Sequence, residues 1–289
     1  MAEHEKKEID EISGTETTGH EWDGIKELNT PLPRWWVWTF YGTIVWAIGY
    51  TIAYPAWPLL SDYTRGLLGY STRLELEREL AERDARWKPY LDKIAALDVA
   101  EVASDAELGA FARASGAATF RTYCSQCHGS GATGAPGYPN LQDDDWLWGG
   151  TYEDILYTVT HGIRDPLDED TRTSEMPAFG RDEILTPEEI EAVADYVLSL
   201  SGRGTGSEEG RQIYLDNCAA CHGENGEGMR EVGAPRLDDQ IWLKVSDRES
   251  IIDFIREPRM GVMPAWKTRL DEARLKSVAI YVHDLGGGE

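Results

Sequence analysis

A long uncharged stretch stands out in the pattern of hydrophobic and polar positions near the N-terminus. From Trp35 to Ser61 no residue carries a charge, and these 27 positions exceed the roughly 20 that a membrane helix needs. Aromatic residues, which favour headgroup depth, gather at both ends of the stretch: Trp35, Trp36, Trp38, Tyr54 and Trp57. The pattern predicts a single transmembrane helix over 34–58, embedded in a lipid bilayer.

The rest of the chain predicts a mainly α fold. The segment 59–103 is rich in Glu, Arg, Leu and Ala, and its periodicity indicates an exposed connecting helix. Apolar positions at helical spacing return at 185–200 and again at 270–285. Ser104 with Glu107 forms the sequence signature of a capping box, so we expect a helix to begin there.

Charge and length narrow the functional classes. The chain has 289 residues, with 28 Lys and Arg against 52 Asp and Glu, so its formal net charge is −24. This length corresponds to about two domains. No basic surface is available to displace counterions from phosphates, so nucleic acid is excluded as a partner. The polar and acidic segment 1–33 differs from the short basic start of a signal peptide, so we expect an uncleaved anchor.

All four cysteines belong to two copies of one motif. The copies are Cys124-Ser125-Gln126-Cys127-His128 and Cys218-Ala219-Ala220-Cys221-His222. Two thiols at this spacing can add across the two vinyl groups of a haem, and the adjacent histidine then lies under the iron as its proximal ligand. A redox dithiol or a zinc site would leave the attached histidines unexplained. The sequence therefore predicts two covalently attached haem c groups.

The repeat extends to both sides of each motif. Gly116 and Phe120 precede Cys124 at the spacing at which Gly210 and Tyr214 precede the second motif, and these positions share one helix face. A glycine there suits a close approach of another helix. Downstream, each copy carries residues expected to support a haem pocket: Pro139, Leu141 and Trp146 in the first, and Pro235, Leu237 and Trp242 in the second. We expect each proline carbonyl to accept the ring N–H of the proximal histidine.

The order of helix, haem motif, Pro-x-Leu, Met-Pro and closing helix resembles the class I cytochrome c domain, in tandem. We place the two domains at 104–203 and 204–289. The resemblance implies a methionine as the sixth iron ligand, and the repeated Met-Pro pairs assign this role to Met176 and Met263.

Other ligands can be weighed against these two. Met260 competes with Met263, whereas Met229 follows its haem motif too closely. His161 and His283 are the alternatives for bis-histidine irons. The spacing implies that each methionine serves the haem of its own copy, but a swap between the copies uses the same residues.

Covalent haem attachment takes place on the outer side of the bacterial inner membrane. We therefore expect a single-pass protein with a cytoplasmic N-terminus and periplasmic haem domains. Irons with His and Met ligands leave no position open for substrate, so the chain is expected to transfer electrons and not to act as an enzyme on its own.

The whole chain resembles the dihaem subunit III of cbb3-type cytochrome c oxidases. The resemblance rests on the N-terminal segment from His20 to Trp36 (HEWDGIKELNTPLPRWW), the single anchor, the Tyr54-Pro55-Ala56-Trp57-Pro58 exit and the tandem haem motifs. It implies that electrons pass from a cytochrome c donor through this subunit to a monohaem cytochrome c subunit. They then reach the haem-copper catalytic subunit, where O2 is reduced and protons are moved.

Three other functions use the same motifs. A membrane-tethered dihaem shuttle would lack permanent partners. A dihaem peroxidase would need one iron that can open a coordination site, and both copies here carry Met-Pro. The cytochrome subunit of a dehydrogenase usually carries three haem motifs, whereas this chain has two.

Overall fold

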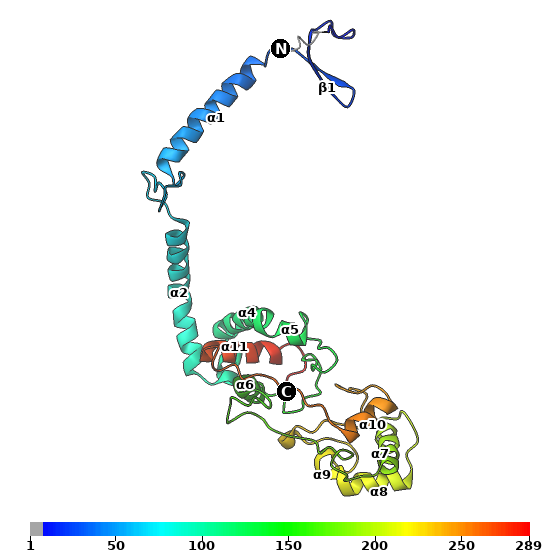
Figure 1. The fold of residues 1–289 in the computed structure, drawn as a ribbon. Coiled ribbons are helices and arrows are strands. Elements are labelled where there is room, and N and C mark those ends of the chain that lie inside the picture. The colour runs from blue at the N-terminus through cyan, green and yellow to red at the C-terminus, as the bar shows by residue number, and fades with distance from the viewer. Residues whose placement is uncertain (1–7) are drawn as a thin grey trace. The chain divides into compact units, whose positions relative to one another are not determined.

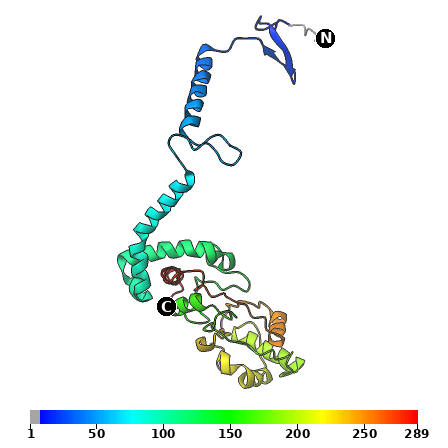
Figure 2. The same cartoon turned by 60° about the vertical axis from the view of Figure 1, so that its left-hand side comes forward.

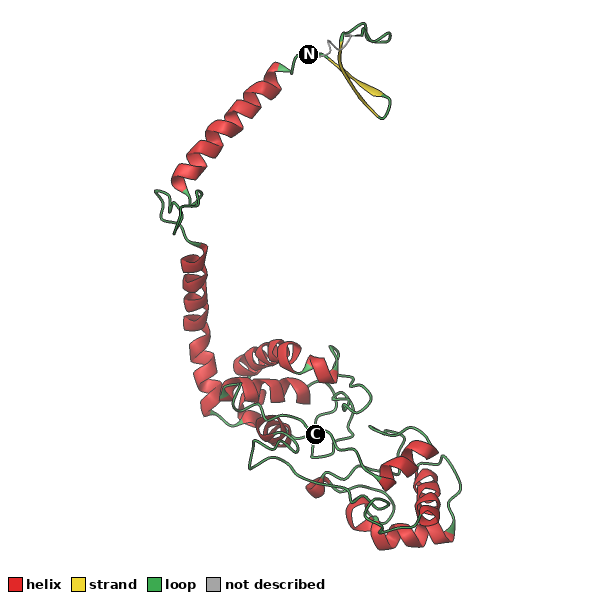
Figure 3. Ribbon diagram, in the orientation of Figure 1, coloured by secondary structure: helices red, strands yellow, loops and turns green. Residues whose placement is uncertain are grey.

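A computed structural model describes residues 8–289. The chain forms two compact units, and the boundary between them along the chain falls between Asp84 and Ala85. The described residues are mainly helical, as predicted, with one two-stranded antiparallel sheet near the N-terminus (Figure 3). That sheet consists of β1 (Thr17–Trp22) and β2 (Ile25–Leu28). It lies within the polar and acidic segment 1–33, whose secondary structure the sequence analysis did not predict.

Helix α1 (Arg34–Ala53) occupies the uncharged stretch but is shorter than the predicted span 34–58. It ends at Ala53 because the next residue, Tyr54, is extended and precedes Pro55, a position that disfavours helical backbone. The chain then folds back, and the amides of Leu67 and Leu68 donate to the carbonyls of Ile52 and Ala53 at 2.9 and 3.0 Å. These bonds satisfy carbonyl groups that the end of the helix leaves open.

Judged by length together with mean hydropathy, no helix within residues 8–289 qualifies as a membrane span.

The helices that follow α1 are labelled in Figure 1 where there is room, and all but the first of them lie wholly in the second unit. Helix α2 (Thr72–Ala96) fills most of the predicted connecting segment and extends across the boundary between the units. The elements that follow are α3 (Val99–Ser104), α4 (Ala106–Tyr123), α5 (Ser125–His128), α6 (Tyr152–His161), α7 (Pro187–Leu200), α8 (Glu208–Asn217), α9 (Ala219–His222), η1 (Arg230–Val232), α10 (Arg248–Arg256) and α11 (Glu272–His283).

The predicted start of the first-copy helix at Ser104 is wrong by one residue. Ser104 ends α3, and the side chain of Asp105 caps α4 by accepting from the amides of Glu107 and Leu108. A carboxylate is as good a cap as a hydroxyl and carries a charge that favours the helix N-terminus.

Two helix crossings hold the second unit together. Helix α4 lies against α11, which both Figure 1 and Figure 2 show, and α7 lies against α8. At the first crossing a Cβ on Gly116 would stand 2.1 Å from the carbonyl oxygen of Ser277, and at the second a Cβ on Gly210 would stand 2.2 Å from that of Ala192. Only glycine permits such an approach, so the close packing predicted for both glycines is present.

These crossings exchange the closing helices of the two sequence copies. Helix α11 closes the second copy but packs on the first helix of the first copy, whereas α7 closes the first copy and packs on the first helix of the second. We call 99–172 together with 263–289 the discontinuous lobe, and 173–262 the continuous lobe. The sequence copies 104–203 and 204–289 therefore do not coincide with the two packed lobes.

Replacing Gly116 with alanine should lower the free energy of unfolding by about 1–3 kcal/mol, because the new Cβ must displace the backbone of α11. Thermal or denaturant unfolding of the full haem-loaded chain measures this loss. Gly204→Ala is the matched control, since its Cβ would meet only Leu198 Cβ at 3.6 Å. Equal stability of the two variants would contradict a crossing that depends on Gly116.

Candidate haem-binding site

Each Cys-x-x-Cys-His motif forms a short helical turn at the end of a longer helix. Cys124 ends α4 and opens α5, and Cys218 ends α8 and opens α9. Both cysteines are half-buried, whereas Cys127 and Cys221 are exposed. Each turn thus carries a half-buried inner thiol and an exposed outer thiol, followed directly by the histidine.

The proximal histidines are oriented by backbone carbonyls, as predicted. His128 Nδ1 lies 3.1 Å from the carbonyl oxygen of Pro139, and His222 Nδ1 lies 2.9 Å from that of Pro235. Burial lowers the pKa of both imidazoles, although these hydrogen bonds partly oppose the shift. Donation from Nδ1–H selects the neutral tautomer with its lone pair on Nε2, the form that binds a metal.

Burial also affects the inner thiols. It raises the pKa of Cys124 to about 11 and that of Cys218 to about 12. Both groups are therefore protonated at neutral pH, and each would supply the sulfur and the hydrogen that thioether formation with a haem vinyl group needs. The residues present fit a covalently attached haem: two free thiols, an oriented neutral imidazole and an apolar cluster beside them.

The sequence spacing implies that each Met-Pro methionine lies beside the haem motif of its own copy. In the structure each methionine lies instead in the lobe that contains the haem motif of the other copy. Met263 packs against the apolar cluster of the discontinuous lobe, which includes Phe120 and also contacts Cys124. Met176 packs against the cluster of the continuous lobe, which includes Tyr214 and also contacts Cys218. The structure thus places each methionine in the cluster that contacts the inner cysteine of the other copy, the arrangement that a swap of ligands between the copies requires.

The predicted supporting residues divide between the same two clusters. Leu141 and Trp146 pack against the first, and Leu237 and Trp242 against the second. The Trp146 indole donates to the carbonyl of Gly287, near the end of the described chain. Because that acceptor follows α11, this bond also ties the second copy's last residues to the discontinuous lobe.

The alternative axial ligands considered in the sequence analysis are exposed or make other contacts. Met260 is 39% exposed, and the backbone of Met229 pairs with Ala234 in an isolated bridge. His283 stacks on Tyr152, with ring centroids 3.6 Å apart, and its Nε2 lies 3.0 Å from the carbonyl oxygen of Glu289. His161 interacts with carboxylates in the loop after α6.

Sequence reasoning missed Arg164, which lies where the two lobes cross over. Its guanidinium donates to the carbonyl of Gly261 at 2.7 Å and to that of Ser174 at 3.2 Å. Each carbonyl belongs to the residue two positions before one of the Met-Pro methionines. Arg164 has a positive φ of 55°, unusual for a residue with a side chain, and no periodic pattern marks it.

Paired Cys-x-x-Cys-His turns with carbonyl-oriented histidines, held between crossing helices, define a cytochrome c. Comparison with protein families is consistent with this class. The model for "N-terminal domain of cytochrome oxidase-cbb3, FixP" matches residues 14–61, and the model for "Cytochrome C oxidase, cbb3-type, subunit III" matches 111–197 and 206–282. The chain belongs to the family of cbb3-type cytochrome c oxidase subunit III, an electron-transfer cytochrome c subunit of that oxidase.

Full-length relatives agree with this assignment. The chain is 51% identical over 286 residues to cbb3-type cytochrome c oxidase subunit FixP of Rhizobium meliloti, an alignment that covers 98% of each protein. It is 54% identical over 279 residues to subunit CcoP of Cereibacter sphaeroides, with 94% of this chain and 95% of that protein covered. It is 53% identical over 296 aligned positions to subunit FixP of Bradyrhizobium sp. strain ORS 278, with both proteins covered completely.

Tyr214→Phe should lower the free energy of unfolding by about 1 kcal/mol. The Tyr214 hydroxyl, on a fully buried side chain, donates to the carbonyl of Gly223 at 2.7 Å, directly after the proximal histidine. Denaturant unfolding measures the loss. Tyr196→Phe is the control, because its ring lies tilted against that of Tyr214, with centroids 5.3 Å apart, but its hydroxyl makes no hydrogen bond to any part of the chain that the structure describes. An equal effect of both changes would count against a role for this bond.

Proposed function

We propose that this subunit carries two haem c groups and transfers electrons between a cytochrome c donor and the catalytic part of the oxidase. The first haem is attached to Cys124 and Cys127, with His128 and Met263 as axial ligands. The second is attached to Cys218 and Cys221. Its axial ligands are His222 and Met176. The observation that carries the proposal is the packing of each methionine in the cluster that contacts the other copy's inner cysteine.

The chain's own residues would perform three tasks in this function. The Pro139 and Pro235 carbonyls hold the imidazoles, the two clusters exclude water, and the methionines close the sixth position. Haem supplies the one-electron chemistry, and methionine ligation places its potential above that of a bis-histidine iron. With both axial positions taken by side chains, O2 reduction belongs to another subunit, and this chain is not an enzyme by itself.

We further propose that α1 is the membrane anchor. It has no charged residue after Arg34, none of its side chains is buried within the unit, and its 20 residues extend about 30 Å, close to the hydrocarbon thickness of a bilayer. Its Trp and Tyr residues lower its mean hydropathy, yet these side chains favour membrane interfaces. Haem attachment then places 59–289 in the periplasm of an inner-membrane protein and 1–33 in the cytoplasm.

The proposed partners are the haem-copper subunit, the monohaem cytochrome c subunit and a cytochrome c donor. Each relative is named as a subunit of a cbb3-type cytochrome c oxidase, which supports a permanent complex. On α1 the Gly42 and Gly49 positions are open, since a Cβ at either would meet nothing within 4 Å. Small residues of this kind let another helix approach closely in lipid. The net charge of −24 favours a basic donor.

The exchanged ligation can be tested in a chain that keeps only one covalent haem. With Cys124→Ser and Cys127→Ser, Met176→His is expected to lower the midpoint potential of the remaining haem by on the order of 0.1 V, because histidine replaces methionine at the iron. Met263→His in the same background should leave that potential unchanged. Potentiometric titration followed by visible spectroscopy measures both.

The reciprocal chain provides the matched control. With Cys218→Ser and Cys221→Ser, the remaining haem must respond to Met263→His and ignore Met176→His. A response to the methionine of the same sequence copy, in either background, would contradict the exchange.

Purification in mild detergent tests the place of this subunit in the oxidase. A C-terminal tag on the full chain is expected to recover a haem-copper subunit and a monohaem cytochrome subunit, identified by mass spectrometry. Gly42→Leu with Gly49→Leu should reduce this recovery severalfold, because the leucines keep the neighbouring helix at a distance. Val45→Leu, a change on the same helix that fills no open glycine, is the control. Recovery of the dihaem chain alone would instead indicate a free-standing tethered shuttle.

A further inference from the structure

The loop 162–175 after α6 has no counterpart of equal length in the second copy, where α10 ends only seven residues before Met263. This loop precedes Met176, the methionine of its own copy, but it also contacts the methionine of the second copy. It pairs with the segment that carries Met263, and the pairing involves backbone, carboxylate and lysine groups. We refer to Met263–Lys267 as the methionine segment.

Backbone hydrogen bonds fix the methionine segment at both ends. The amide of Ile163 donates to the carbonyl of Met263 at 2.9 Å, and the amide of Met263 donates back to Ile163 at 3.0 Å. The amide of Trp266 donates to the carbonyl of Val159 at 3.1 Å. These bonds set the position of the methionine backbone relative to α6.

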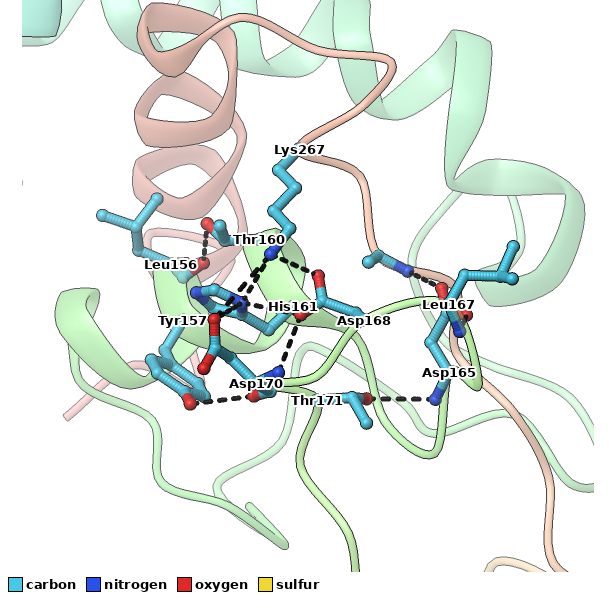
Figure 4. Close-up of polar contacts among 11 residues, drawn as sticks. Leu156, Tyr157, Thr160, His161, Asp165, Leu167, Asp168, Asp170, Thr171 and Lys267 are labelled. Atoms are coloured by element: carbon cyan, nitrogen blue, oxygen red, sulfur yellow. Dashed lines mark hydrogen bonds and ion pairs between the residues drawn. The ribbon is translucent and has the colours of Figure 1, made fainter.

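Two buried aspartates hold the same segment through their side chains. Asp165 Oδ2 accepts from the amide of Ala265 at 2.7 Å. The Asp168 side chain is only 1% exposed, and its Oδ2 lies 2.8 Å from Lys267 Nζ (Figure 4). His161 Nδ1, at 3.2 Å from Asp168 Oδ1, contacts the other oxygen of this carboxylate. The Lys267 end of the methionine segment is thus held by an ion pair with Asp168, in addition to the backbone hydrogen bonds.

The same residues could be mistaken for a cation site. Ligand atoms of His161, Asp168 and Asp170 lie within 4.8 Å of one another. However, Lys267 Nζ lies 2.8 Å from Asp168, 3.9 Å from Asp170 and 3.4 Å from His161 Nδ1, so an ammonium group already supplies the positive charge. The cluster is therefore better explained as an internal ion pair that holds the methionine segment.

We propose that Asp165, Asp168 and Lys267 form a latch that keeps Met263 on the iron of the first haem. This inference rests on the proposed exchange of ligands. The three are positioning residues, because they act on the segment that carries the ligand and not on the haem. The latch lowers the rate and extent of methionine dissociation from that iron.

The second methionine has no equivalent latch among the described residues. The residues that follow Met176 are held by backbone bonds, in which the amides of Phe179 and Gly180 donate to the carbonyls of Ile255 and Arg256 at 3.2 Å. The nearby ion pair between Arg181 and Glu257 spans 3.8 Å, with side chains 60% and 62% exposed, and such pairs contribute little. Loss of the latch should therefore affect only the first haem.

The test is the binding of imidazole, a neutral ligand that replaces methionine, to the oxidised full chain with both haems attached. Asp168→Asn is expected to raise the affinity of the first haem for imidazole about tenfold, because a buried charged hydrogen bond is lost. It should also weaken the near-infrared absorption band that marks methionine on ferric haem. The first haem is identified as the one that Met263→His alters.

Variants of the same cluster separate a latch from other effects. Lys267→Met should act in the same direction as Asp168→Asn, although the two change the local charge oppositely, and the double variant should be no worse than either single one. Lys267→Arg should restore nearly wild-type affinity. Asp170→Asn is the control, because this carboxylate is exposed and lies 3.9 Å from the lysine.

Each outcome supports or overturns the latch. Wild-type imidazole affinity in Asp168→Asn, with both haems attached, would overturn it, and opposite shifts in Asp168→Asn and Lys267→Met would show a through-space charge effect instead. If Asp168→Asn does not fold, the exposed Lys267 and its Met and Arg variants decide the matter. Alteration of the haem on Cys218 by Met263→His would overturn the ligand exchange and the latch together, whereas the other failures leave the exchange intact.

Discussion

The close crossing of α4 and α11 at Gly116 is the contact on which the haem-bearing unit depends. A missing side chain lets the two backbones touch, and Gly210 does the same for α8 and α7. Helix α7 directly precedes α8, whereas α11 is the last helix. To form both crossings the chain must therefore leave the discontinuous lobe after α6 and return to it before α11. The Met-Pro segments lie on the two connections, so each methionine arrives in the lobe opposite to its sequence copy.

Cations gather at this crossover although the chain has a large excess of negative charge. Arg164 donates to both connections, and Lys267 pairs with buried Asp168. Arg172 bonds the Asp154 carboxylate at 3.2 Å, while its guanidinium lies 5.3 Å from the centre of the Trp148 ring, against which Gly233 of the other lobe packs. These contacts link the two lobes at several points, and under the proposed function they set the distance between the two haem sites.

Much of this site follows from the sequence, because its chemistry is local. The haem motifs, the proline carbonyls and the Gly-aromatic helix faces each depend on residues no more than 13 positions apart. The exchange could not be predicted, since two similar copies satisfy the same pattern whichever closing helix they share. Asp165 and Lys267 were missed because they lie 102 positions apart in irregular segments without periodicity. Helix α1 ends before the predicted limit of 58 because Pro55 restricts Tyr54 to extended backbone.

The discontinuous lobe has a consequence for how the protein is made. The continuous lobe is complete once residue 262 has been synthesised, so its helices can pack while the C-terminus is still being added. The lobe that begins first along the chain, at 99, lacks α11 and Met263 until synthesis is nearly finished. Under the proposed ligand set, the Cys-x-x-Cys-His motif translated first is therefore the last to obtain its methionine, after the motif that follows it already has its own.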